Sequence, residues 1–232
     1  MQEIELKDIK KDYRSNEAYK SLRTNIEFSG EENKVLLFTS CTPNEGKSTV
    51  TISLAQSLAE AGKKVLFIDA DLRKSVLAGR HKVVGQLKGL SHFLSGQADL
   101  ADVMYRVKNT NMVMIFAGVV PPNPAELLGN KRFESLLVSA RKSYDYVIID
   151  APPLGSVIDA AIIAKQSDAS ILVISANTIS HKFAKVVKDQ LAKSGCPILG
   201  VVLNKVDMAQ NKYYGKYYGK YYGQYGEGNS HE

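Results

Sequence analysis

The sequence has only two cysteines, Cys41 and Cys196, in 232 residues. So few cysteines exclude a disulfide framework as the source of stability. The N-terminus lacks a basic segment followed by an apolar run, so no secretion signal is predicted and we expect a cytoplasmic protein. The longest apolar runs, at 112–120 and 169–174, are about half or less of the roughly 20 residues that a membrane helix needs. We therefore expect any attachment to the inner face of the membrane to go through a partner protein.

Aliphatic residues are missing from the C-terminal end. From Ala209 onward there is no Val, Ile, Leu, Met or Phe, whereas Lys-Tyr-Tyr-Gly recurs every four residues. Such a segment cannot bury enough surface to offset its chain entropy, so residues 208–232 are predicted to form a disordered tail. This tail nevertheless carries seven of the twelve tyrosines. They are Tyr213, Tyr214, Tyr217, Tyr218, Tyr221, Tyr222 and Tyr225.

The remaining composition is that of an ordinary globular protein, with 44% hydrophobic and 23% charged residues. Its length suits one large α/β domain with a single core. The net charge of +6 would suit a phosphate-bearing ligand, an acidic partner or nucleic acid, and it is too small to choose among them.

Apolar runs alternate with helical patterns along the chain, which indicates βα units and a mostly parallel sheet flanked by helices. We expect an α/β domain over residues 34–207, preceded by a helical segment at 1–33 whose helix spans Arg14 to Phe28. A helix stop is predicted at Gly62. The predicted strands are Lys34–Ser40, Lys64–Asp69, Met112–Ala117, Tyr144–Asp150, Ser170–Ser175 and Ile198–Asn204.

The strongest chemical signal is the segment Cys-Thr-Pro-Asn-Glu-Gly-Lys-Ser-Thr at 41–49, between a predicted strand and a predicted helix. In a phosphate-binding loop, backbone N–H groups and the helix N-terminus surround the phosphates, the lysine reaches the β and γ oxygens, and the serine hydroxyl binds Mg²⁺. The usual first glycine is replaced by Cys41, which is either a redox-sensitive thiol or, as we favour, a small residue filling the strand end. The predicted nucleotide-binding residues in this loop are Asn44, Glu45, Gly46, Lys47, Ser48 and Thr49.

Carboxylates follow two of the predicted strands. Asp69 and Asp71 come after one strand, and Asp150 ends another. Because the carboxyl ends of parallel strands meet at one edge of a sheet, we expect these groups near the loop, where they can hold Mg²⁺ or accept a proton from an attacking hydroxyl. A single aspartate at a strand end is more often a turn or cap residue, but three that converge on a Lys-Ser loop favour a catalytic site.

Taken together, these motifs resemble those of the bacterial tyrosine kinases of capsule and exopolysaccharide synthesis, in the form whose kinase is separate from its membrane activator. The loop at 41–49 is similar to the family's modified Walker A motif. The DxDxR pattern at 69–73 is similar to its Walker A′ motif, and the segment 147–153 to its Walker B motif. The segment 121–128 and the tyrosine-rich end also fit.

The resemblance implies an ATP- and Mg²⁺-dependent protein-tyrosine kinase that phosphorylates its own tyrosine cluster between subunits and regulates polysaccharide synthesis and export. Lys47 would bind the γ-phosphate, Ser48 would bind Mg²⁺, and the three aspartates would handle metal and proton, with Asp69 and Asp71 both open as the base. It also implies a membrane activator, a counteracting tyrosine phosphatase and a ring-like homo-oligomer, but no nucleic acid as partner. The ring contact would involve Glu17, Lys20 and Arg23, where lysine replaces the arginine of the family's ExxRxxR motif.

Other interpretations of the sequence remain open. The segment Asn204-Lys205-Val206-Asp207 matches the guanine-reading motif of small GTPases, although the prolines at 152 and 153 stand where a GTPase needs a flexible glycine. We expect Asn204 beside an adenine edge instead. A partition or septum-placement ATPase shares the expected fold, but Thr42 occupies the position of that class's signature lysine. A third interpretation takes the tail as an arm that stacks on single-stranded nucleic acid, but three lysines give little support for it.

Overall fold

The computed structural model describes residues 1–6, 12–80 and 87–207 of the chain. The predicted tyrosine-rich tail at 208–232 lies outside the described residues, and so does the segment 81–86.

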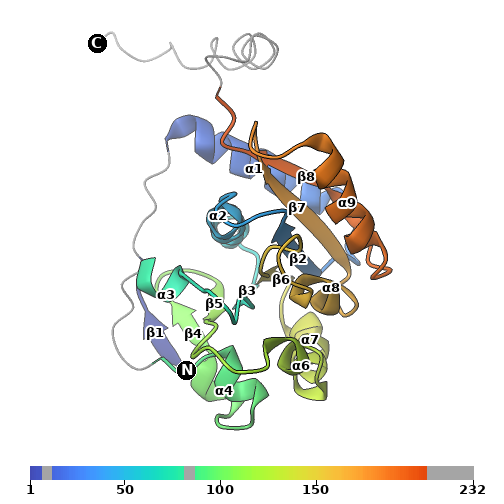
Figure 1. Ribbon diagram of the computed structural model, residues 1–232. Helices are drawn as coiled ribbons and strands as arrows, with labels where there is room; N and C mark the ends of the chain where they lie inside the picture. Colours follow the sequence, from blue (N-terminus) through green and yellow to red (C-terminus); the bar gives the residue numbers. More distant parts are fainter. Residues whose placement is uncertain (7–11, 81–86, 208–232) are drawn as a thin grey trace, which may run out of the picture.

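The described residues form strands and helices that alternate over most of the chain (Figure 1). The strands are β1 (Gln2–Ile4), β2 (Val35–Ser40), β3 (Val65–Asp69), β4 (Tyr105–Val107), β5 (Met112–Ile115), β6 (Tyr146–Asp150), β7 (Ala169–Ser175) and β8 (Ile198–Asn204). The helices are α1 (Tyr13–Glu27), α2 (Lys47–Glu60), α3 (Leu77–Arg80), α4 (Leu90–Leu94), α5 (Leu100–Val103), α6 (Pro124–Leu128), α7 (Lys131–Ser143), α8 (Asp159–Ala164) and α9 (His181–Ala192).

One eight-stranded sheet runs through the molecule, with the strand order β1-β4-β5-β3-β6-β2-β7-β8. All neighbouring strands are parallel except β4 and β5, which are antiparallel. The six strands that follow β4 in this order, β5, β3, β6, β2, β7 and β8, therefore all end at the same edge of the sheet. This is the edge at which ligands bind in open α/β sheets, and it carries the predicted loop and carboxylates.

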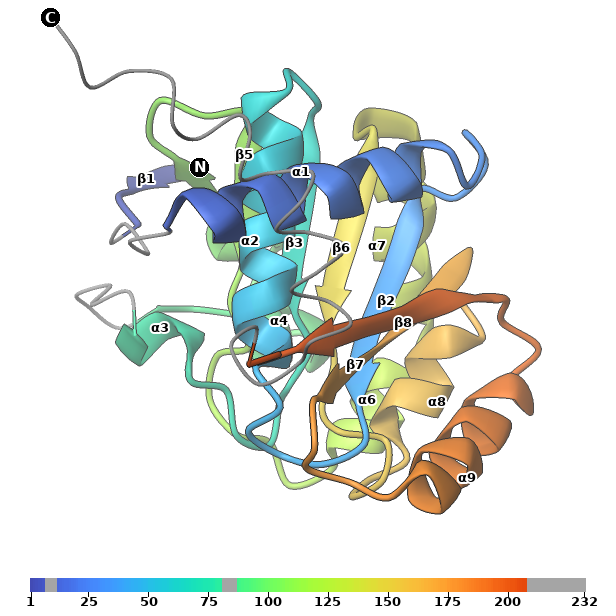
Figure 2. The ribbon, with the colours of Figure 1, turned by 90° about the horizontal axis from the view of Figure 1, so that it is seen from above.

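Both faces of the sheet are buried over strands β5, β3, β6, β2 and β7, as the near-continuous apolar strands predicted. The edge strand β8 differs, because Leu199, Val201 and Leu203 on it are exposed. Along β2, Val35 and Leu37 belong to one core, and Leu36 and Phe38 to the other. Residues of α1 and α2 join the second core, whereas residues of α4 to α9 join the first. Figure 2 shows α1 lying across α2 on one side of the sheet, with α7 on the opposite side. The fold is thus the expected α/β P-loop architecture with a mostly parallel sheet between helical layers.

All six predicted strands are present, with shorter ends in places. The strand predicted over 112–117 stops at Ile115, because the next two carbonyl groups turn to another partner. Phe116 O accepts from Leu90 N at 2.7 Å, and Ala117 O from Ser91 N at 3.0 Å. The strand predicted from Tyr144 starts two residues later, since Tyr144 N still donates to Ala140 O as the C-cap of α7.

The N-terminal segment contains a strand that the sequence did not predict. β1 pairs in parallel with β4 at the edge of the sheet, and each of these strands has three residues. Such short strands give no measurable periodicity. The predicted helix at 14–28 is α1, which begins one residue earlier because the Asp12 side chain caps it by accepting from Ser15 N at 2.8 Å.

Candidate active site

The loop between β2 and α2 has the backbone shape of an anion cradle. Asn44 and Gly46 both have left-handed backbones, with φ of 66° and 84°. A Cβ at Gly46 would lie 2.2 Å from Asn204 Nδ2, so both the conformation and the close approach require glycine here. The loop ends at the N-terminus of α2, where free backbone N–H groups and the helix dipole favour a phosphate.

Glu45 braces this loop from inside. Its side chain is buried, and its carboxylate accepts hydrogen bonds from Thr42 N at 2.7 Å and from Ser175 N at 3.2 Å. The first bond closes the loop on itself, and the second fastens it to the end of β7. Glu45 was predicted as a nucleotide-binding residue; the structure gives it contacts to the backbone of its own chain.

Cys41 fills the position of the missing glycine and has no exposed surface. Burial, and then the Glu45 carboxylate, raise the pKa of its thiol to about 12. The thiolate needed for redox chemistry is therefore disfavoured at neutral pH, which agrees with the packing role that we expected. The loop after β6 packs closely here, since a Cβ on Gly155 would lie 2.1 Å from Cys41 O.

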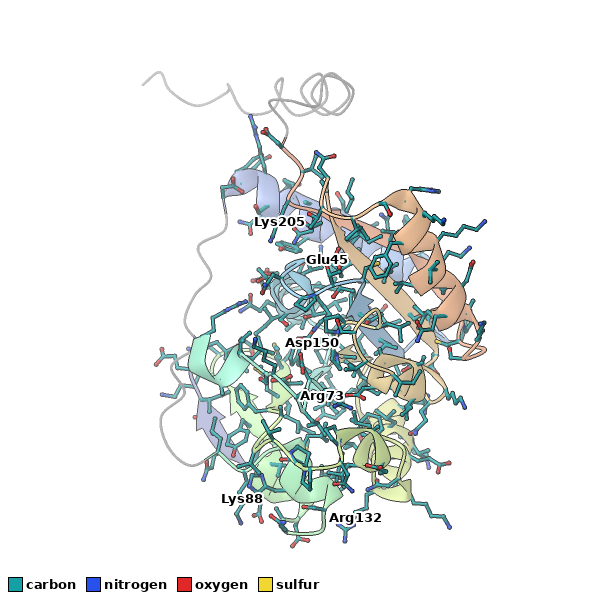
Figure 3. The ribbon with its side chains drawn as sticks, in the orientation of Figure 1. Glu45, Arg73, Lys88, Arg132, Asp150 and Lys205 are labelled. Carbon is teal, nitrogen blue, oxygen red and sulfur yellow. The ribbon has the colours of Figure 1, made fainter. Side chains whose placement is uncertain are left out.

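Lys47 and Asp150 form a buried ion pair at the centre of the site. Lys47 Nζ lies 2.5 Å from Asp150 Oδ1, and the exposed fractions of the two side chains are 7% and 1%. Lys47 opens α2, and Asp150 closes β6, which lies next to β2 in the sheet. In the view of Figure 3, Asp150 lies between Glu45 and Arg73. The predicted lysine and the predicted Walker B carboxylate are thus in direct contact.

Asp69 joins this pair through the sheet, because it stands in register with Asp150 on the neighbouring strand. It is also buried, and its Oδ2 accepts a hydrogen bond from the Ser75 hydroxyl. Burial, and then the negative charge of Asp150, raise the pKa of Asp69 from 3.8 to about 7, against the opposing effects of Ser75 and Lys47. A carboxylate with a pKa near neutral is suited to accept a proton and release it again.

Asp71 has a different environment from Asp69. It is half-buried, and its Oδ1 accepts from Lys74 N at 2.9 Å and from Arg73 N at 3.3 Å. These are the contacts of an aspartate that shapes a turn. Of the two aspartates that the sequence left open, only Asp69 thus belongs to the buried cluster with Lys47.

One ion pair in the site was not predicted. The Arg73 guanidinium donates to both carboxylate oxygens of Asp159, at 2.7 and 2.9 Å, and Asp159 is completely buried at the start of α8. This bidentate pair anchors the loop after β3 to the segment that follows Asp150. Arg73 could be found from its place in the DxDxR pattern, but Asp159 belongs to no motif, so only the fold reveals its role.

Ser48 follows Lys47 in the first turn of α2, as the loop motif requires. Within 1–6, 12–80 and 87–207, no group of three or more His, Cys, Asp or Glu side chains could hold a metal ion. Mg²⁺ needs fewer protein ligands than that, since it usually binds one or two carboxylates, waters and substrate phosphates. The donor set fits such an ion, because the carboxylates of Asp69 and Asp150 stand in register on neighbouring strands and the Ser48 hydroxyl follows Lys47.

The end of β8 also holds the loop. Asn204 Nδ2 donates to Glu45 O at 2.9 Å, and Lys205 Nζ donates to Asn44 O at 2.6 Å. Lys205 reaches the loop from a left-handed backbone with a φ of 55°. Asn204, which we expected beside the nucleobase, therefore lies at the phosphate loop and uses one amide hydrogen to hold it.

The three residues predicted for the subunit contact lie on α1, and two of them pair with each other. Lys20 Nζ lies 2.7 Å from Glu17 Oε1 on the surface of the helix. Arg23 instead donates to Ser57 O of α2 at 2.8 Å within the same chain. The seven predicted phosphoacceptor tyrosines lie outside the described residues.

Comparison with known proteins identifies the family. The family model described as an AAA domain matches residues 43–193. The tyrosine-protein kinase CpsD of Streptococcus agalactiae serotype III (strain NEM316) is 46% identical over 200 residues, which cover 86% of each chain. This chain belongs to the bacterial tyrosine-protein kinase family. The kinase domain of the Escherichia coli tyrosine kinase ETK superimposes on this kinase with a TM-score of 0.77 and 35% identity, covering 86% of this chain and 80% of that one.

The same fold extends to another class of P-loop protein. The septum site-determining protein MinD from Pyrococcus horikoshii OT3, solved with Mg-ADP, has a TM-score of 0.65 and 27% identity, covering 76% of this kinase and 72% of that chain. This likeness confirms that the septum-placement class shares the fold. No helix among the described residues of the kinase is long and apolar enough to cross a membrane.

Proposed function

We propose that the kinase transfers the γ-phosphoryl group of ATP to tyrosine hydroxyls of its C-terminal cluster, chiefly on a neighbouring copy. The observation that carries this proposal is the buried group of Lys47, Asp150 and Asp69 beside a phosphate-binding loop. Such a group supplies a cation for the phosphates and carboxylates for metal and proton, which is what phosphoryl transfer requires of a protein.

Lys47 changes partner when the nucleotide binds. Without nucleotide, its ammonium group is held by Asp150 at 2.5 Å. The phosphate oxygens compete for the same ammonium, and backbone N–H groups of the loop and α2 bind them at the same time. The Asp150 carboxylate that Lys47 releases, together with the Ser48 hydroxyl, would hold Mg²⁺, which supplies charge neutralisation of the phosphates.

Asp69 is the better candidate for the base. A tyrosine hydroxyl that replaces the Ser75 hydroxyl at Asp69 Oδ2 would donate its proton to this carboxylate as it attacks the γ-phosphorus. Asp71 would instead maintain the loop, since its Oδ1 is engaged with two backbone N–H groups. For the nucleotide, Asn204 supports adenine as the nucleobase. Its second amide hydrogen and its carbonyl oxygen match the N7 acceptor and the N6 donor of adenine.

We infer the setting of this activity from the family. The Streptococcus relative is named as a tyrosine-protein kinase CpsD. We place this kinase in the synthesis and export of capsular or extracellular polysaccharide, on the inner face of the membrane. A membrane activator would bind it there, and a tyrosine phosphatase would reverse the modification.

Phosphotyrosine formation with Mg·ATP tests the proposal directly. The wild type, alone and with a membrane activator of this family, should become phosphorylated on the tail, and Lys47→Met should not, because the cation at the β and γ oxygens is lost.

Asp69→Asn should lower turnover far more than Asp71→Asn while nucleotide binding persists. ATP should compete for the site much better than GTP. Equal phosphotyrosine in Lys47→Met and wild type would overturn the assignment.

A further inference from the structure

The Ser75 hydroxyl occupies a place in the active site that the tyrosine kinase activity does not explain. Ser75 is exposed, in the loop between β3 and α3, yet its Oγ donates to Oδ2 of the buried Asp69. Asp69 stands in register with Asp150, which holds Lys47. Ser75 is therefore hydrogen-bonded to one of two neighbouring carboxylates, and Lys47 is paired with the other.

A structural role accounts for only part of this arrangement. Ser75 Oγ also accepts a hydrogen bond from Leu77 N at the start of α3, but that distance is 3.4 Å, at the long end for such a bond. The helix that it would cap has only four residues. The closer contact is the one with Asp69, in which an accessible hydroxyl donates to the carboxylate that we propose as the base.

We propose that Ser75 is an internal phosphoryl acceptor of this kinase, modified within its own subunit. This inference rests on the proposed function, because ATP is the donor. Ser75 Oγ forms a bond to the γ-phosphorus, its proton passes to Asp69 Oδ2, and the bond from the γ-phosphorus to the β–γ bridging oxygen breaks to release ADP. The structure already contains the hydrogen bond along which the proton moves.

The product has a physical consequence for the site. A phosphoserine carries a charge of about −1.5 to −2 at neutral pH. Beside Asp69 and Asp150 this charge is repelled, so the modified loop would move away from the carboxylates. The position at Asp69 Oδ2 would then be open to a tyrosine hydroxyl from another copy. Phosphorylation of Ser75 would therefore precede efficient phosphorylation of the tail.

The test uses the full-length chain with all seven tail tyrosines replaced by Phe, which removes the competing acceptors. After incubation with Mg·ATP, intact mass and peptide mapping should show one phosphate on Ser75. Ser75→Thr in the same background should give phosphothreonine at 75, and Ser75→Ala should give no phosphate. Ser95→Ala is the matched control, because Ser95 is also an exposed serine but its hydroxyl donates to His92 O instead of a carboxylate. It should leave the modification at Ser75 unchanged.

Two further comparisons separate the possible failures. Lys47→Met should abolish the Ser75 modification, and diluting the protein should not change its rate, because donor and acceptor share one subunit. Absence of phosphate at 75 in both the Ser and Thr forms, while the wild type phosphorylates its tail, would overturn this inference and leave the proposed function standing. Absence of both modifications in the presence of an activator would count against the proposed function itself.

Discussion

Buried acidic side chains in this kinase have distinct tasks that their sequence context alone does not separate. Glu45 and Asp150 are each about 1% exposed, yet one accepts backbone N–H groups and the other holds Lys47. Asp69 differs again, because the Lys47 cation that acts on it is already paired with Asp150. These three buried carboxylates are therefore satisfied by different means.

Glu45→Ala should weaken both the fold and the nucleotide site. The substitution leaves Thr42 N and Ser175 N without their shared acceptor, and buried groups left unpaired in this way cost about 1–3 kcal/mol. Denaturant unfolding should show that loss, and titration with nucleotide should show weaker binding because the loop is no longer braced. Glu60→Ala at the exposed end of α2 is the control, with an expected change within about 0.5 kcal/mol. Equal stability of the two variants would contradict the bracing role.

Asp69 should make the stability of the nucleotide-free kinase depend on pH near neutrality. Its pKa is raised from 3.8 to about 7 in the folded protein, so the folded state binds a proton that the unfolded state has already lost between these values. The stabilisation is thus complete below pH 3.8 and is lost as the pH rises through about 7.

Thermal unfolding of the wild type and of Asp69→Asn across this range measures the effect. The melting temperature of the wild type should fall relative to that of Asp69→Asn as the pH rises, since the amide does not ionise. Parallel curves for the two proteins would show that Asp69 titrates at its ordinary value.

At the scale of elements, the phosphate loop depends on strands that are distant in sequence. The loop follows β2, but it is held by the ends of β7 and β8 through Ser175, Asn204 and Lys205. A loop with two left-handed residues is costly for a free chain. The surrounding strand ends maintain it, so the binding site is a product of the sheet rather than of the loop sequence.

Asn204→Ala should therefore weaken nucleotide binding even for a ligand without a base. One neutral hydrogen bond contributes about 1 kcal/mol, which corresponds to about fivefold in affinity. Inorganic triphosphate is the informative probe, because it cannot contact a base-reading side chain. Weaker binding of triphosphate would show that Asn204 holds the loop, whereas a loss confined to ATP would assign it to the adenine edge alone. Asn111→Ala is the control, because Asn111 is an exposed asparagine just before β5 whose amide donates to Gly62 O, away from the loop.

Much of this arrangement could be predicted from the sequence, and the exceptions have physical reasons. The six long strands, the loop and the convergence of Lys47 with Asp150 follow from apolar periodicity and from the common edge of parallel strands. β1 and β4 are too short to show a period. The pairing of Arg73 with Asp159 joins residues 86 positions apart and belongs to no pattern. The difference between Asp69 and Asp71 arises from burial, which two residues separated by one alanine do not reveal.

At the scale of the whole molecule, α1 packs on α2 and leaves Glu17 and Lys20 paired on the surface. We retain the proposal that this face joins copies of the kinase in a ring, but Arg23 already has a partner in its own chain. Its replacement would remove the contact with Ser57 as well as any contact between subunits.

The double variant Glu17→Ala with Lys20→Ala should lower the mass of the assembly without lowering the melting temperature. These side chains form an exposed pair within one helix, and surface ion pairs contribute little to stability, so the fold does not depend on them. Light scattering measures the mass, and Asn25→Ala on the same helix is the matched control. An unchanged mass in the double variant would show that these residues belong to a solvated helix face and not to a subunit contact.

The burial of both cysteines determines how this kinase can be labelled. Cys41 and Cys196 are the only thiols in the chain, and burial raises the pKa of each. Reagents such as maleimides react with exposed thiolates, so the native chain should remain unmodified under mild conditions. A single cysteine introduced at an exposed position, for instance in place of Ser95, would then carry one fluorophore without any need to remove the native thiols. The chain therefore offers a background without reactive thiols for fluorescence and spin-label measurements.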